Sequence, residues 1–162
     1  MPSRPARTVA EEIGQRTPFR SRGQEAIVSL LRTADVVRWT LGQGMAAEDL
    51  TLQQYNVLRI LRGAGDQGLP TLEIGSRMVE RQPGVTRLVD RLVKKGLVER
   101  TRGAEDRRVV RCTITAAGLR LLEQLDDVVV SADEAVQTAL GEDALPQLIA
   151  LLDSLRTAFP VD

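Results

Sequence analysis

Residues 83–114 combine a short amphipathic helix with a β-hairpin, and little more than one glycine separates them. Pro83 suits the first turn of the helix, and Gly96 suits its end, after two lysines that favour the negative end of the helix dipole. The expected buried stripe has the spacing i, i+3, i+4, i+7: Val85, Leu88, Val89 and Leu92. The segments LVERTR and VVRCTI then alternate apolar and polar residues, which predicts two strands joined by a tight turn.

Three earlier helices are predicted from capping signals and apolar stripes, over about 22–45, 52–62 and 71–79. Each has a residue that can cap its first turn: Ser21, Thr51 and Thr71. The first two also have the glutamine of a capping box, Gln24 and Gln54. The third helix and the helix that begins at Pro83 are separated by a tight turn, and the second exposes arginines. This pattern is a helix-turn-helix with a recognition helix, and the hairpin makes it a winged helix-turn-helix.

Positive charge is concentrated on the same stretch of chain. Residues 77–111 contain eleven basic and five acidic residues, a net charge of +6, whereas the whole chain is neutral. The rest therefore carries −6, so one module attracts polyanions and the remainder repels them. Because a recognition helix enters the major groove and a wing lies over the adjacent backbone, the predicted partner is double-stranded DNA.

Four residues of the recognition helix are candidate DNA contacts. Gln82 can read adenine, and Arg87 and Arg91 can read guanine, because these side chains match the donor and acceptor pattern of those bases in the major groove. Thr86 suits a phosphate contact. The helix is therefore expected both to read sequence and to hold the backbone.

The turn of the hairpin carries a second group of candidates. Arg108 is expected to enter the minor groove, where narrow A·T-rich segments concentrate negative potential, and Arg107 is expected to contact a phosphate. Asp106 would be repelled by DNA unless it had an internal role. We expect its carboxylate to hold the guanidinium of Arg108 in one geometry.

Composition argues against several other functions. With 162 residues, 43% hydrophobic and 27% charged, the chain resembles a soluble globular protein, and it has no apolar run long enough for a membrane span or signal peptide. A cytoplasmic location is expected. Because the chain has no histidine and a single cysteine, a zinc site, an internal disulfide and a histidine-based triad are not expected. We expect no enzyme activity, no metal and no cofactor.

A further apolar stripe follows a helix cap at Thr115. Its spacings alternate between four and three residues: Gly118, Leu122, Leu125, Val129, Ala132, Val136 and Ala139. This period is that of a helix packing along a partner helix, which predicts a homodimer on a palindromic DNA site. The alternative is that this helix and an apolar helix over about 145–155 fold onto the core of one chain.

The string EDRRVVRCTITAAG resembles the wing signature of the MarR family of bacterial transcription regulators, Asp-x-Arg, a strand and then Leu-Thr-x-x-Gly. Asp106 and Arg108 match the first pair, and Thr115 and Gly118 match the second, with Ile114 in place of leucine. The segment GVTRLVDRLVKKGLVER is also similar to the recognition helix and following strand of that family. The resemblance covers about 140 residues, from residue 22 to the C-terminus.

This resemblance implies a mainly α-helical fold with a small β-hairpin, in which N- and C-terminal helices form a dimerisation lobe. Residues 1–20 would be a partly ordered arm, and residues 21–162 a single MarR-like domain. Within it, 51–114 would form the winged helix-turn-helix lobe, while 21–50 and 115–162 would supply the dimerisation helices.

The resemblance also implies a homodimeric repressor that a small phenolic or otherwise apolar effector releases from DNA. Trp39 and Tyr55 lie on helices that border the ligand cleft in this family, although aromatic residues on helices are more often part of the core. Two alternatives remain. One is a protein-interaction module that has lost specific DNA binding, and the other is a redox-sensing regulator that uses Cys112. The alternation of Cys112 with Val110 and Ile114 favours a buried small hydrophobic residue.

Overall fold

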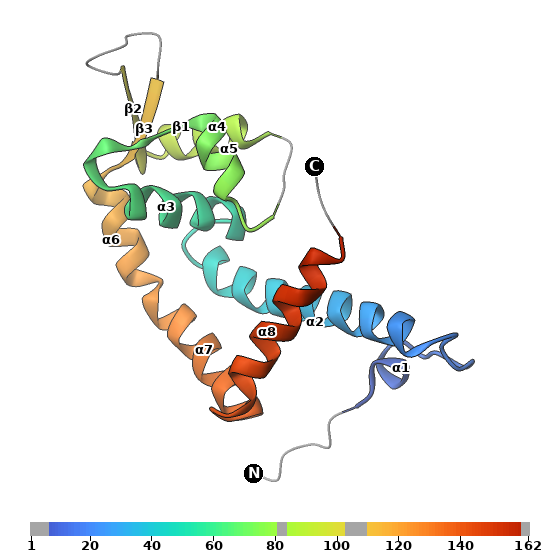
Figure 1. Ribbon diagram of the computed structural model, residues 1–162. Coiled ribbons are helices and arrows are strands. Elements are labelled where there is room, and N and C mark those ends of the chain that lie inside the picture. Colours follow the sequence, from blue (N-terminus) through green and yellow to red (C-terminus); the bar gives the residue numbers. More distant parts are fainter. Residues whose placement is uncertain (1–6, 81–83, 103–109, 160–162) are drawn as a thin grey trace. The chain divides into compact units, whose positions relative to one another are not determined.

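A computed structural model describes residues 7–80, 84–102 and 110–159 (Figure 1). The chain divides into two compact units, Met1–Gln43 and Gly44–Asp162. In chain order the elements are α1 (Val9–Glu12), α2 (Arg22–Ala46), α3 (Leu52–Ala64), the 3₁₀ turn η1 (Gly65–Gln67), β1 (Leu69–Pro70), α4 (Thr71–Arg77), α5 (Val85–Lys94), β2 (Val98–Arg102), β3 (Val110–Ile114), α6 (Ala116–Gln124), α7 (Asp126–Leu140) and α8 (Ala144–Thr157). The predicted fold, mainly helical with a small sheet in a winged helix-turn-helix, is confirmed.

The first unit contains α1 and most of α2. A capping box formed by Thr8 and Glu11 begins α1, so part of the predicted N-terminal arm is a short capped helix. The Glu12 carboxylate pairs with the Arg32 guanidinium of α2, with 3.2 Å between Oε2 and Nε. The helix predicted over 22–45 is present as α2 and ends one residue later.

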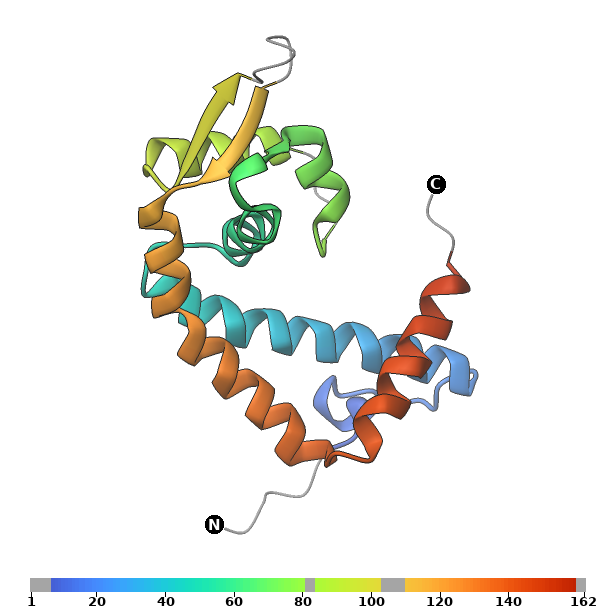
Figure 2. The same ribbon diagram turned by 60° about the vertical axis from the view of Figure 1, so that its left-hand side comes forward.

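The helices α3, α4 and α5 of the second unit pack on one side of the sheet. The capping box of Thr51 and Gln54 begins α3, as predicted. Figure 2 shows β2 and β3 side by side, with α6 and α7 running almost in line and α8 folding back from them. The shared core of this unit consists of Met45, Leu50, Tyr55, Val57, Leu58, Leu61, Leu69, Ile74, Met78, Val89, Leu92, Leu97, Val98, Cys112, Leu122 and Leu125.

The sheet has three antiparallel strands in the order β1-β3-β2. The hairpin of β2 and β3 was predicted, whereas β1 was not, because the segment DQGLP reads as a turn. Leu69 and Pro70 of β1 pair with Cys112 and Arg111 of β3, more than forty residues along the chain. β3 is therefore the central strand of the sheet.

The start of α4 differs from the prediction. Pro70, not Thr71, is the N-cap residue, and no side chain caps the helix. Thr71 is the first residue of α4, and its side chain does not cap the helix. Its hydroxyl lies 3.8 Å from the sulfur of Cys112. Ile74 and Met78 are buried as expected, but the side chain of Leu72 is exposed.

The predicted stripe of residues 118–139 is divided between two environments. Gly118 and Leu122 of α6 and the adjoining Leu125 are buried in the core of their own chain, as the alternative interpretation held. In α7, by contrast, no residue is buried, and Val136 is exposed. The helix also breaks at Leu125, where α6 ends and α7 begins. Because Val129 at the start of α7 also packs against this core, only the later part of the stripe on α7 is left available for a partner.

Gly68 occupies a backbone conformation that should not tolerate a side chain. Its φ is +57°, and an added Cβ would lie 2.5 Å from the carbonyl oxygen of Cys112. Gly68→Ala is therefore expected to lower the free energy of unfolding by about 2 kcal/mol or more, as measured by urea denaturation. Gly63→Ala is the control, because the space around a Cβ there is open and alanine favours a helix. Equal stability of the two variants would contradict this account of Gly68.

Candidate nucleic-acid interface

The recognition helix α5 presents a polar face and buries an apolar one. Its N-cap is Gly84, whose φ of +100° lies in the left-handed region. Val89 and Leu92 are fully buried, which fixes the orientation of the helix about its axis. Three of the predicted contacts, Thr86, Arg87 and Arg91, are exposed on the other side. The fourth, Gln82, lies outside the described residues.

The wing strands lead to the other predicted contacts. Arg102 at the end of β2 pairs with Val110 at the start of β3, so the two ends that carry the turn are adjacent. The turn itself, with Asp106, Arg107 and Arg108, lies outside the described residues. The predicted pairing of Asp106 with Arg108 therefore stays a prediction.

The eight basic residues of the 77–111 segment that the structure describes fall into two groups. Four are used inside the fold: Arg77 with Glu73, Lys95 with Asp49, Arg100 with Asp90, and Arg111 with the carbonyl oxygens of Gln67 and Gly68. Four others are exposed and form no ion pair or hydrogen bond with the described part of the chain: Arg87, Arg91, Lys94 and Arg102. The cations available to an external anion are thus fewer than the sequence count indicates.

The unpaired cations of α5 share one face of the helix. Arg87, Arg91 and Lys94 follow one another at i, i+4 and i+7, which places them along a single line on the surface. This line is on the face opposite the buried Val89 and Leu92. A row of cations of this kind attracts a polyanion such as the DNA backbone.

Lys95 does not belong to that row. Its ammonium group contacts both the side chain and the carbonyl oxygen of Asp49, and its Nζ lies 2.8 Å from Oδ2. The hydrogen bond from Lys95, followed by its positive charge, lowers the pKa of Asp49. Lys95 therefore holds the turn between α2 and α3.

Two polar side chains of α3 hold the segment that leads into the recognition helix. The amide oxygen of Asn56 accepts a hydrogen bond from the backbone N–H of Val79 at 3.0 Å. Gln53 donates to the carboxylate of Glu80 at 3.1 Å. The sequence analysis did not single out either residue, because three amide side chains follow one another in the first turns of α3 and nothing in their spacing distinguishes these two.

The two aromatic candidates for a ligand pocket have different environments. Tyr55 is buried in the core, and its hydroxyl accepts a hydrogen bond from Arg59 at 3.2 Å. Trp39 belongs to the first unit, and 66% of its surface is exposed. Their role as pocket residues stays a prediction.

Cys112 is completely buried at the centre of the sheet. It lies opposite Leu69 on one side and Arg100 on the other. Its burial agrees with the interpretation of this residue as a small hydrophobic core residue and does not favour direct access by an oxidant.

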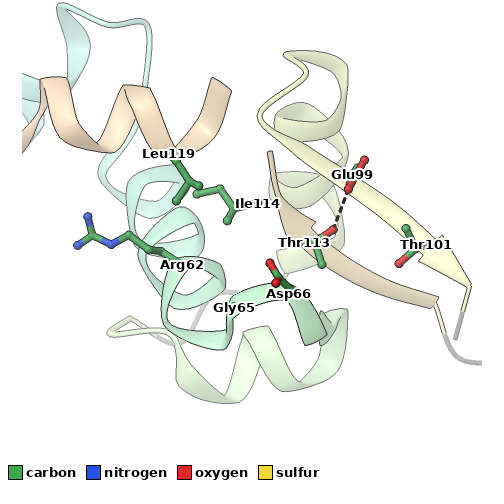
Figure 3. A pocket seen from close by; sticks show the side chains of 8 residues that line it. All are labelled: Arg62, Gly65, Asp66, Glu99, Thr101, Thr113, Ile114 and Leu119. Atoms are coloured by element: carbon green, nitrogen blue, oxygen red, sulfur yellow. Dashed lines mark hydrogen bonds between the residues drawn. The ribbon is translucent and has the colours of Figure 1, made fainter. Parts of the chain in front are cut away.

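A depression of about 310 Å³ lies on the other face of the sheet, near the end of α3 (Figure 3). It is lined by Arg62, Gly65, Asp66, Glu99, Thr101, Thr113, Ile114 and Leu119. Thr113 donates to the carboxylate of Glu99 at 3.4 Å across its floor. None of the predicted DNA contacts lines it, and its two carboxylates would repel phosphates.

Two features are absent from the part of the chain that the structure describes. No helix there is long and apolar enough to cross a membrane. No group of three or more histidine, cysteine, aspartate or glutamate side chains there is arranged to hold a metal ion.

Comparison with known sequences identifies relatives of this fold. The MarR family model matches residues 50–110. The transcriptional regulator FarR of Neisseria gonorrhoeae is 25% identical over 138 residues, which cover 85% of this chain and 93% of that protein. The transcriptional repressor IacR of Pseudomonas putida is 28% identical over 105 residues, which cover 65% of this chain and 62% of that protein.

Solved structures give the same result. A MarR transcription factor from Planctomyces limnophilus is 41% identical, covers 84% of this chain and 98% of its own, and has a TM-score of 0.63. The S. aureus MepR–DNA complex is 23% identical, with 81% and 96% coverage and a TM-score of 0.73. NadR in complex with 4-hydroxyphenylacetate is 25% identical, with 86% and 97% coverage and a TM-score of 0.68. Both the sequence matches and the winged helix-turn-helix architecture therefore show that this chain belongs to the MarR family of DNA-binding transcriptional regulators.

Proposed function

We propose that this chain is a homodimeric repressor that binds a palindromic site in double-stranded DNA and is released by a small apolar or phenolic ligand. The observation that carries the DNA-binding part is the row of unpaired cations on α5. Arg87, Arg91 and Lys94 share the exposed face of the helix that this fold places in the major groove. Arg102 adds a cation at the base of the wing.

The proposed contacts divide into base reading and backbone holding. Arg87 and Arg91, with Gln82 outside the described residues, read base edges in the major groove. Thr86 contacts a phosphate. In the wing, Arg108 enters the minor groove and Arg107 holds a phosphate, with Asp106 orienting Arg108. Base reading supplies specificity, and the phosphate contacts supply most of the salt dependence.

Homodimerisation is supported by the apolar surface of the C-terminal helices. Neither α7 nor α8 has a buried residue. Their exposed large apolar residues are Val130, Val136, Leu140, Leu148, Ile149 and Leu151. Apolar residues at this density on two consecutive helices mark an interaction surface, and a second copy of the chain would also supply the second recognition helix of a palindrome.

Repression and ligand release are supported by the relatives. IacR is a repressor by name, and NadR binds 4-hydroxyphenylacetate in its solved complex. We extend both properties to this chain, with Trp39 and Tyr55 as pocket residues. Aromatic and aliphatic carboxylic acids, including 4-hydroxyphenylacetate, are added to the complex of the protein with a duplex that it selects from a random-sequence library. Loss of affinity for this duplex would support the ligand part. Unchanged affinity across the panel would contradict it.

The DNA-binding part is tested by the salt dependence of affinity. A duplex is first selected from a random-sequence library by the wild-type protein, and is then titrated from 50 to 200 mM salt beside a scrambled duplex. If Lys94, Arg102 and Arg107 each neutralise one phosphate per subunit, the proposed dimer neutralises six. The logarithm of the binding constant should then fall with a slope of about −5 against the logarithm of the salt concentration, or roughly 10³-fold over this range.

Two results would contradict the proposal. A slope near zero would mean that Lys94, Arg102 and Arg107 do not contact phosphates. Equal affinity for the selected and scrambled duplexes would mean that the protein does not read sequence, as in an interaction module that retains the fold alone.

A further inference from the structure

An ion pair connects the recognition helix to the wing. Oδ1 of Asp90 in α5 lies 2.7 Å from Nη1 of Arg100 in β2. About a third of the Arg100 side chain is exposed, and somewhat less than half of the Asp90 side chain. The pair is therefore partly shielded from solvent, and its two members come from the two elements that are expected to meet DNA.

Strand geometry places Arg100 on the inner face of the hairpin. Side chains alternate along β2, so Arg100 is on the same face as Val98, which is buried, and opposite to Glu99 and Thr101. Its partner across the ladder is the buried Cys112 of β3. Arg100 is thus fixed at the middle of the strand and extends toward α5.

The choice of partner by Asp90 is informative. Arg87 and Lys94 lie three residues before and four residues after Asp90, which are the usual positions for an ion pair within a helix. Neither forms one in the described part of the chain, and Asp90 pairs across the fold with Arg100 instead. This carboxylate does not neutralise the DNA-facing cations of its own helix.

The electrostatics of Arg100 agree with this geometry. The hydrogen bond to Asp90 raises the pKa of Arg100, partial burial opposes that change, and the side chain of Cys112 adds to it. Asp90 is thus the main group that stabilises the guanidinium charge on this inner face.

We propose that the Asp90–Arg100 ion pair sets the position of the wing relative to the recognition helix, and that both residues are positioning residues for simultaneous contact with the major and minor grooves. The inference rests on the proposed function, in which α5 and the wing bind the same duplex. The negative charge of Asp90 repels the phosphates of bound DNA, so charge alone predicts that its removal strengthens DNA binding. If Asp90 positions the wing, its removal should instead weaken DNA binding.

The test compares Asp90→Asn with Glu99→Gln on the selected duplex at one salt concentration. Each change removes one negative charge from the winged module, but Glu99 is on the outer face, and among the described residues its side chain accepts only a long hydrogen bond from Thr113. Charge counting predicts tighter binding by both variants. We expect Asp90→Asn to bind roughly three- to tenfold more weakly than wild type, and Glu99→Gln to bind as tightly as wild type or more tightly.

A footprint separates positioning from general loss of structure. Hydroxyl-radical cleavage reports minor-groove protection by the wing, and methylation of guanine N7 reports major-groove protection by α5. Asp90→Asn, at a concentration that saturates the duplex, should lose wing protection and keep major-groove protection. The exchanged pair Asp90→Arg with Arg100→Asp should recover part of both affinity and wing protection.

Each outcome has a separate meaning. The proposed function fails if the affinity of the wild-type protein does not fall with salt, or if the protein does not prefer the selected duplex to the scrambled one. If wild type does bind but Asp90→Asn behaves like Glu99→Gln, or loses both protections equally, the positioning proposal fails while the proposed function stands.

Discussion

Replacing Arg87 or Arg91 with alanine is expected to weaken binding to the selected duplex by between roughly 30-fold and 10⁴-fold. Both guanidinium groups are exposed on α5 and form no ion pair with the described part of the chain, so their donors are free for base edges. A good bidentate contact is worth about 1–3 kcal/mol, and the proposed dimer would lose two, which gives roughly 2–6 kcal/mol. Titration of the selected duplex by fluorescence anisotropy measures the loss.

The matched control is Arg120→Ala. Arg120 is an exposed arginine on α6, outside the recognition helix and the wing, and its removal changes the net charge by the same amount. We expect less than a threefold effect on affinity, because its charge acts only over a distance that salt screens. If Arg91→Ala lost no more affinity for the selected duplex than for the scrambled one, Arg91 would hold a phosphate and not a base.

The helical part of the fold could be predicted because its signals are local. A capping box and the stripe that follows it lie within one or two turns, so Thr51 and Thr115 mark the starts of α3 and α6 correctly. The same holds for the β2–β3 hairpin, whose strands are close in sequence. The strand β1 was not predicted, because its two residues become a strand only through pairing with a segment more than forty residues away.

The candidate site was predictable as a set of residue types but not as a set of available charges. A sequence count treats Lys95 and Arg100 like Arg91, since all three are cations in one segment. In the fold, Lys95 pairs with Asp49, which is 46 residues away, and Arg100 of β2 pairs with Asp90 of α5. Such pairs depend on tertiary contacts, which periodicity within a segment does not report.

The stripe of residues 118–139 shows a different limit of sequence patterns. A spacing of four and three residues indicates that one face of a helix is buried, but it does not distinguish burial in the same chain from burial against a partner. Leu122 and Leu125 pack in their own core, and Val129 also packs against it. A charge at position 129 would therefore disturb the fold of the subunit as well as an interface. A test of dimerisation needs a residue farther along the chain.

Ile149→Asp on α8 is expected to convert the proposed dimer to a monomer at micromolar concentrations. Ile149 is 57% exposed in the single chain, so the subunit does not depend on it for its own core. In a two-fold interface the substitution occurs twice, and each copy removes an apolar contact worth about 1.5–3 kcal/mol and buries a charge at a further cost. A total of at least about 4 kcal/mol corresponds to a rise of roughly 10³-fold in the dimer dissociation constant.

Sedimentation equilibrium measures the change in assembly, and far-UV circular dichroism shows whether the helices are retained. Gln147→Asp is the control, because it adds the same charge to an exposed polar position of the same helix. A monomer binds with one recognition helix and one wing instead of two of each. Ile149→Asp should therefore also lose most of its affinity for the selected duplex, while Gln147→Asp retains it. An Ile149→Asp protein that remained a dimer with wild-type affinity would show that α8 does not form the interface through this residue, and the partner surface would then have to be sought on the exposed apolar residues of α7.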